Sequence, residues 1–412
     1  MRETTVVERV FAEFEADALP TFRPPGVADA QRRVRERRRR RRSVLAGLTA
    51  LLVGGPAGAF ALAGGATDPQ PAPTPTPVVP SPPAGKLTER RIALNGVPGR
   101  LTDIRFVDAR AGWALFDTCG PEGDPAGRDC VRTVARTTDT GRTWRYSSWT
   151  EAAGPVQLLP LDPDTATVTS VRGHRVTRDG AATFTTHPLD DPPAVVSRAM
   201  ATPSGLYVGC PGAEGPGRFP VTCDRSQVRR IGGGALPRQP ALTIKPDNVG
   251  LFEGRDGRVW VTVSRTGGTA VATSDDRGAT WRTLPTVPGA AALALSPDGR
   301  EVWLLGLERP DDVWRLAGDR WRHSGGLPDD TLQAAAVGAG VLVVTSAYGG
   351  LGFWAGGRYT DVPELTRTLR RTQDDRSAGV SVLPDGTIEV RQGQTLILGS
   401  GRSTDRTWVR LS

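Results

Sequence analysis

The chain has 412 residues, enough for one large domain and additional segments. Its net charge of +8 at first suggests a nucleic-acid partner, but residues 31–42 contain nine arginines and one glutamate, a balance of +8 by themselves. The rest of the chain is neutral overall, so the composition excludes a general electrostatic attraction to nucleic acid.

Residues 1–43 are predicted to form a cytoplasmic tail that ends in the arginine-rich run. Apolar residues near its start (VVERVFAEFEADAL) recur at roughly helical spacing, which indicates either a short docking helix or a weakly structured tail. Residues 44–64 carry no charge and are long enough to cross a bilayer as one transmembrane helix. Because positive residues stay inside, we expect a signal-anchor with a cytoplasmic N-terminus and the remainder of the chain outside.

An alternative for the same stretch is a cleaved export signal. Arg41, Arg42 and the following Ser-Val-Leu resemble a twin-arginine signal, and Ala59–Ala61 offers a cleavage site. The chain would then be secreted rather than anchored. Both alternatives place the rest of the protein outside the cytoplasm.

Residues 65–86 are rich in proline and are predicted to form an extended linker of about 60 Å, at ~3.1 Å per residue. A proline-rich ligand for an SH3-like domain is the functional alternative. Next to a predicted membrane span, a stalk is the simpler interpretation.

From residue 87 to residue 412 the pattern changes to short β-runs separated by Gly, Asp and Pro turns. A turn leads into an apolar strand seven times, at intervals of about 40 to 53 residues. These seven stretches are Asp108–Phe116, Asp162–Ser170, Thr202–Cys210, Gly254–Val263, Ser296–Leu307, Gly338–Ser346 and Leu383–Gln392. One four-stranded unit per interval predicts an all-β fold, a β-propeller of seven blades. Residues 87–94 are predicted to add a strand to the last blade and so close the ring.

The four cysteines form two local pairs, Cys119 with Cys130 and Cys210 with Cys223. They show no C-x-x-C spacing and no Cys/His cluster, so no metal site is predicted. Two disulfides in an oxidising compartment are expected. Each pair flanks the loop after the second strand of a blade, and we expect these loops to form a binding surface, although added stability alone would also explain the bridges.

The most specific signal is a repeated pattern, S/T-x-D-x-G-x-T-W. Its two full copies comprise Thr137, Asp139, Gly141, Thr143 and Trp144, and then Ser274, Asp276, Gly278, Thr280 and Trp281. Weaker copies are found at Thr177–Phe184 and Ser403–Trp408.

On these residues the chain resembles the Asp-box (BNR-repeat) β-propellers, which include sialidases, sortilin-type receptors and photosystem assembly factors of the Ycf48 type. The resemblance covers roughly residues 88 to 412 and is closest to the non-catalytic members. It implies that each box occupies the hairpin between the third and fourth strands of a blade. There the aspartate would accept backbone N–H bonds and the glycine would take a positive φ, so these residues are interpreted as structural rather than catalytic or calcium-binding.

An enzyme is not expected. Sialidases need an arginine triad, a Tyr–Glu pair and an acidic Asp, and neither Phe22–Pro25 nor Arg218–Pro220 matches their Arg-Ile-Pro phrase. The three histidines are scattered without catalytic or metal spacing. No catalytic, cofactor-binding or metal residue is therefore predicted.

The sequence thus predicts a single-pass membrane protein whose propeller binds an unknown cell-surface glycan or protein partner. One alternative is a transmembrane signalling protein whose tail binds a cytoplasmic regulator. A second alternative is a sialidase-like exo-glycosidase.

Overall fold

The computed structural model describes residues 87–90, 99–119, 129–212, 223–245, 248–265, 267–306, 312–371, 378–393 and 395–411. These residues belong to one compact unit that spans residues 77–412. The predicted tail, membrane span and linker lie outside the described residues. Within the described part of the chain, no helix has the length and apolar character needed to span a membrane.

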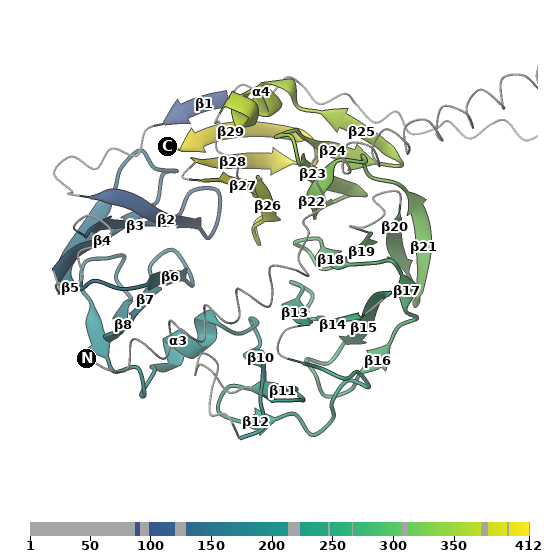
Figure 1. Cartoon of the computed structure of the whole chain (residues 1–412), viewed down its shortest axis with the longest axis horizontal. Helices are drawn as coiled ribbons and strands as arrows, with labels where there is room; N and C mark the ends of the chain where they lie inside the picture. The colour runs from purple at the N-terminus through teal and green to yellow at the C-terminus, as the bar shows by residue number, and fades with distance from the viewer. Residues whose placement is uncertain are drawn as a thin grey trace, which may run out of the picture. The chain divides into compact units, whose positions relative to one another are not determined.

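Seven sheets, antiparallel except for one strand of the last, follow one another along the chain and form a ring around a central axis (Figure 1). The first consists of β2 (Arg100–Phe106), β3 (Gly112–Thr118), β4 (Asp129–Thr137) and β5 (Arg145–Ala152). The second consists of β6 (Val156–Pro160), β7 (Ala166–Ser170), β8 (Gly173–Thr177) and β9 (Thr185–His187). Helix α3 (Ala194–Ala199) precedes the third sheet, which consists of β10 (Leu206–Gly209), β11 (Gln227–Arg230) and β12 (Gly234–Ala235).

The remaining four sheets complete the ring. The fourth contains β13 (Val249–Glu253), β14 (Val259–Arg265), β15 (Gly268–Ser274), β16 (Arg282–Thr283) and β17 (Val287–Pro288). The fifth contains β18 (Ala292–Leu295), β19 (Val302–Leu305), β20 (Val313–Ala317) and β21 (Arg320–Gly325). The sixth contains β22 (Thr331–Gly338), β23 (Val341–Ser346), β24 (Leu351–Ala355) and β25 (Arg358–Asp361), followed by helix α4 (Pro363–Arg371). The seventh contains β26 (Gly379–Val382), β27 (Ile388–Gln392), β28 (Thr395–Arg402), β29 (Asp405–Leu411) and β1 (Leu87–Arg90). The protein is therefore an all-β, seven-bladed β-propeller, as predicted.

The closing strand comes from the N-terminal end of the propeller. β1 pairs in parallel with β29, with Leu87 opposite Trp408. Arg90 of β1 also donates from Nη1 to the carbonyl oxygen of Thr140 in the first blade, at 2.8 Å. One short strand thus joins the last blade to the first, which confirms the predicted closure.

The connections alternate between two faces because consecutive strands within a blade are antiparallel. We call the face that carries the turns after the first and third strands of each blade the turn face. The loop face carries the connections after the second strands and those between successive blades. All seven predicted turns lie on the turn face, and a hydrogen bond from Thr140 N to Arg110 O joins two turns there in blade one.

The core is divided among the seams between neighbouring blades. Separate clusters of buried apolar side chains fill the seams between blades one and two, three and four, four and five, five and six, six and seven, and seven and one. The seam after blade two differs, since its cluster consists of Val176 of β8 with Val195 and Val196 of α3. Helix α3 therefore packs where the adjoining blade would otherwise contribute a strand.

Blade three departs from the predicted four strands. The turn before β10 corresponds to the turn between first and second strands elsewhere, so β10 is the second strand of its blade. In chain order α3 stands where the first strand of this blade would be, but it packs against blade two, and β10 is the strand of this sheet nearest the ring centre (Figure 1). The stretch that precedes this turn contains Pro188, Pro192 and Pro193, and proline cannot donate to a strand ladder.

Candidate binding surface

Both expected disulfides are present, and both stand on the loop face. Cys119 joins Cys130 between β3 and β4, and Cys210 joins Cys223 between β10 and β11. The bridges therefore occupy the same position in blades one and three. Most residues inside each bridged loop, 120–128 and 213–222, lie outside the described residues.

A buried arginine anchors the first bridge. Arg132 of β4 is 1% exposed, and its guanidinium group forms an ion pair from Nη1 with Asp117 Oδ2. Nη2 donates to the carbonyl oxygen of Gly154 at 2.7 Å, and Nε lies 3.4 Å from Glu151 Oε1. Asp117 Oδ1 in turn accepts from the backbone N–H of Cys119 at 2.8 Å. The cysteine end of the loop is thus tied to a buried charge.

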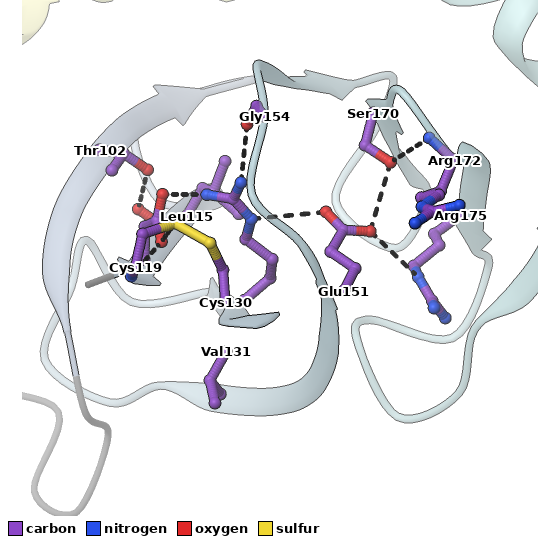
Figure 2. A network of polar contacts seen from close by, with 12 residues as sticks. Thr102, Leu115, Cys119, Cys130, Val131, Glu151, Gly154, Ser170, Arg172 and Arg175 are labelled. Carbon is purple, nitrogen blue, oxygen red and sulfur yellow. Dashed lines mark hydrogen bonds and ion pairs between the residues drawn. A yellow bond between two sulfur atoms is a disulfide. The ribbon is translucent and has the colours of Figure 1, made fainter. Parts of the chain in front are cut away.

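The same network continues into blade two (Figure 2). Glu151 Oε2 accepts from Ser170 Oγ at 3.3 Å and lies 4.0 Å from Arg175 Nε. The guanidinium group of Arg175 stacks on the ring of Trp149, with its carbon 4.9 Å from the ring centroid. Alternating charges therefore connect the Cys119–Cys130 loop to the neighbouring blade and hold the loop face together across the seam.

Asp117, Cys119 and Cys130 lie close enough together to surround an ion. The two cysteines are joined to each other, however, and thiolates are the form of cysteine that binds metal. This cluster is therefore a bridged loop end and not a metal centre.

Exposed apolar side chains also gather on the loop face. Val171 is 53% exposed in the β7–β8 turn, and Leu189 is 46% exposed in the connection after β9. Tyr348 is 75% exposed between β23 and β24, where its carbonyl oxygen accepts from Arg370 Nε of α4 at 3.2 Å. Of the five large apolar residues that are exposed in the described chain, these three share the face of the two disulfides.

The residues of the repeated pattern lie on the opposite, turn face. In the β4–β5 hairpin, Asp139 Oδ1 accepts from the backbone N–H groups of Arg142 and Thr143, both at 2.9 Å. Its Oδ2 accepts from Thr143 Oγ1 at 2.7 Å, and Thr137 Oγ1 donates to Oδ1 at 2.9 Å. In the β15–β16 hairpin Asp276 accepts the same bonds from Ser274 and Thr280. Trp144 and Trp281 follow these turns and are partly buried.

The weaker copy in blade two forms the same turn. Asp179 accepts from Thr177 Oγ1 and from both the backbone N–H and the hydroxyl of Thr183. Ala181 has φ +69° where the full copies have Gly141 at +79° and Gly278 at +89°, while Gly180 precedes it at +68°. In this copy the glycine therefore lies one position earlier, and Ala181 takes the left-handed conformation that Gly141 and Gly278 take in the full copies. The turn is otherwise unchanged.

Substituting Gly278 tests how far the turn depends on glycine. An added Cβ would lie 2.5 Å from Leu236 Cδ1 in a left-handed backbone, so Gly278→Ala should lower the free energy of unfolding by roughly 2 kcal/mol. Gly289→Ala is the matched control because Gly289 has φ +78° with no atom within 4 Å of the added Cβ. Urea denaturation should show a larger loss for Gly278→Ala than for the control, and equal losses would refute the steric part of the account.

The three aspartates have depressed pKa values. Hydrogen bonds from the Thr183 hydroxyl and backbone lower the pKa of Asp179 to about 2, and those from Thr280 do the same for Asp276. At Asp139, burial acts in the opposite direction, but the bonds from Thr143, Thr137 and Arg142 outweigh it and lower the pKa to about 2.

This depression predicts a specific acid response. A carboxylate with a lower pKa in the folded state stabilises the fold above the unfolded value of 3.8, and that contribution is lost as the pH falls towards 2. The double variant Asp179→Asn/Asp276→Asn should be less stable at pH 7 and should lose less stability between pH 4 and pH 2 than the unaltered chain. Thermal unfolding midpoints measured across this range check it, and parallel curves would contradict it.

Two cavities open on the turn face, opposite the predicted binding face. One, of about 650 Å³, lies among the turns of blades three, four, five and seven. The other, of about 790 Å³, lies between the turns of blades two and three. Both include Pro203 and Ser204, the turn that precedes β10. The sequence pattern predicts turns at many of these positions but no binding role.

No protein-family model matches the chain, and no curated protein matches its sequence. Among solved structures, one of YCF48 bound to D1 peptide is 14% identical, with a TM-score of 0.41 over 71% of this chain and 88% of that chain. YCF48 from Cyanidioschyzon merolae is 13% identical, with a TM-score of 0.31 over 71% and 93%. The β-propeller domain of the Trilobed protease from Pyrococcus furiosus is 10% identical, with a TM-score of 0.37 over 76% and 92%. The assignment of a seven-bladed propeller rests on the strand pairing and not on these distant likenesses.

Proposed function

We propose that the chain is a membrane-anchored, extracytoplasmic propeller that binds a cell-surface glycan or protein partner without catalysis. The observation that carries the proposal is the loop face, where two bridged loops and three exposed apolar side chains occur together. Loops carried on a rigid scaffold commonly carry recognition, and exposed apolar side chains on the same face would add apolar contact area for a partner.

The compartment follows from the same bridges. Disulfides form and persist outside the cytoplasm, which supports export of the propeller. The predicted single span at residues 44–64 would hold it at the cell membrane with the N-terminus in the cytoplasm, and the linker would set its distance from the bilayer. Cleavage at a twin-arginine signal, which would release the propeller, is the alternative for the anchor.

We further infer that the turns at Asp139, Asp179 and Asp276 are Asp-boxes with a structural role. Both oxygens of each carboxylate accept hydrogen bonds from hydroxyl or backbone donors of the same hairpin. The two oxygens are therefore not free to bind a substrate or calcium together.

The described histidines also support a non-catalytic function. His174 lies 2.9 Å from Thr169 Oγ1, His187 lies 3.2 Å from Thr185 Oγ1, and His323 lies 3.3 Å from Asp312. None of these contacts pairs a nucleophile with both a base and an orienting carboxylate in the described residues. A fluorogenic sialoside assay should therefore show no turnover, and turnover that one point substitution abolishes would refute this part of the proposal.

Binding to isolated envelopes of the source cell tests the surface itself. The variant Val171→Asp/Leu189→Asp/Tyr348→Asp should reduce the bound fraction at least ten-fold, since it places charges in the apolar part of the loop face. Tyr146→Asp is the matched control because Tyr146 is 44% exposed on β5, near the turn face. Equal binding by the two variants would contradict the proposal.

A further inference from the structure

The central edge of blade three is an incomplete sheet. The backbone N–H and C=O of Leu206 point to this edge and are already hydrogen-bonded to the preceding turn. Thr202 N donates to Leu206 O at 2.8 Å, and Leu206 N donates to Thr202 Oγ1 at 3.2 Å. The backbone N–H and C=O groups of successive strand residues point to opposite edges of the strand. Those of Val208, two residues after Leu206, therefore point to the same edge as those of Leu206. No described residue bonds to them there, and Val208 is partly exposed.

The outer side of β11, by contrast, is paired within the blade. Val228, which lies opposite Val208, donates from N to Gln239 Oε1 at 2.8 Å, and its carbonyl oxygen accepts from Leu236 N at 3.0 Å. Unpaired strand edges are templates for an additional strand. The free pairing capacity of this blade therefore faces the ring centre.

The two turn-face cavities meet at the entrance to this edge. They share Pro203 and Ser204, the turn from which β10 begins, and together extend from blade two to blades five and seven. Phe252 of β13 lines the larger opening with a side chain that is 37% exposed. An extended chain entering here would find an apolar contact next to the turn from which β10 begins.

The charges of the cavities favour an acidic ligand. Among the lining carboxylates, Asp162 accepts from two backbone N–H groups of its own turn, Glu253 accepts from Ser204 N at 2.8 Å, and Asp256 accepts from Arg258 N at 3.1 Å. The guanidinium groups of Arg198, Arg255 and Arg277, in contrast, have no hydrogen-bond or ion-pair partner among the described residues. The carboxylates keep their charge but are held by backbone donors. Four arginines against three carboxylates give the lining a small positive balance, and three of the guanidinium groups remain available.

We propose that an extended acidic peptide of a partner protein enters at Pro203–Ser204, pairs with the free edge of β10 at Val208 as the missing strand of blade three, and places its carboxylates against Arg198, Arg255 and Arg277. Main-chain bonds would supply the geometry, and the arginines would select for negative charge. This site is on the face opposite the loop face, so it goes beyond the function proposed above.

A phage-displayed library of linear dodecapeptides, selected on the full chain, provides the probe. Synthetic copies of the enriched sequences should carry Asp or Glu and should bind at least ten-fold more weakly to Arg198→Ala/Arg255→Ala. Arg300→Ala is the matched control, because Arg300 lies on a neighbouring turn with its side chain 84% exposed and outside both cavities. It should change binding less than two-fold.

Hydrogen exchange then locates the peptide. The Val208 amide should exchange faster than the Val228 amide in the free chain and should slow at least ten-fold when the peptide binds. Each of three results would overturn the inference. The library would give no enriched sequence, the peptides would bind the Arg198→Ala/Arg255→Ala variant as tightly as the unaltered chain, or the exchange of the Val208 amide would not change. The loop-face variant Val171→Asp/Leu189→Asp/Tyr348→Asp should bind the peptide normally, so failure here and failure of the proposed function are separate results.

Discussion

Replacing Arg132 with methionine should lower the free energy of unfolding by about 3 kcal/mol, because removing one partner of a buried ion pair leaves the other charge uncompensated. The guanidinium group is 1% exposed and contacts Asp117, Glu151 and the carbonyl oxygen of Gly154. The side chain of Glu151 is 5% exposed. It would keep only the hydrogen bond from Ser170 and the ion pair with the more distant Arg175. Urea denaturation at pH 7 under oxidising conditions measures the loss.

Two further variants separate charge from packing. Arg105→Met removes one of the two arginines that pair with Asp103. The side chain of Arg105 is 45% exposed, so its loss should cost less than about 1 kcal/mol. Arg132→Met/Glu151→Gln removes charge from both sides of the buried pair and should recover part of the loss. A cost for Arg132→Met no larger than for Arg105→Met would show that the network does not hold the loop face.

Truncating Trp408 should cost about 3–5 kcal/mol, the range for a fully buried aromatic side chain. Its ring is 2% exposed, lies 6.4 Å from that of Phe353 in blade six, and covers Gly399, where an added Cβ would be 2.3 Å from the ring. Because Trp408 lies opposite Leu87 of the closing strand, Trp408→Ala should also accelerate hydrogen exchange throughout β1.

Trp281→Ala is the appropriate control for this substitution. Trp281 follows a turn in the same way, but it is only partly buried and donates to Arg238 O at 3.2 Å. Its truncation should cost less and should leave the exchange of β1 unchanged. Equal destabilisation by both variants, or protected β1 amides in Trp408→Ala, would contradict the role of Trp408 in closing the ring.

The number of blades was predictable because each blade repeats one local signal. A glycine or aspartate turn followed by an apolar run occurs seven times, and every such run became the second strand of a sheet. An aromatic residue likewise lies in, or directly before, the fourth strand of six blades: Trp144, Phe184, Trp281, Trp321, Tyr359 and Trp408. The closing strand was predictable for a different reason, since a ring needs its last blade completed and residues 87–90 carry the only β-run before blade one in the described chain.

The missing strand of blade three was not predictable from the same signal. The turn at Thr202–Gly205 is intact, and only the segment before it changes, from a strand to α3. Residues 194–199 (AVVSRA) are apolar enough for either structure, so packing against Val176 decides between them. The cavities beside this turn arise because α3 replaces a strand before it. Such a change leaves no local pattern in the sequence.

The candidate surface was predictable only in outline. The cysteine spacings located both bridged loops, but the partners of Arg132 lie on β3, on β5 and in the connection after β5, and contacts among these segments leave no fixed spacing to detect. A weak signal was present at Arg132, because it interrupts β4, in which every residue except Asp129 is buried or half-buried. The exposed apolar residues of the loop face are separated by up to 177 positions, from Val171 in blade two to Tyr348 in blade six, and only the propeller geometry places them on one face.

The most direct measurement is hydroxyl-radical footprinting of the full chain on its own cell envelopes, compared with the purified protein. Binding through the loop face predicts that oxidation of Val171, Leu189 and Tyr348 falls on the envelope, while oxidation of Tyr146 stays the same. Unchanged oxidation of these three residues, with protection confined to the turn face, would contradict the loop face as the binding surface.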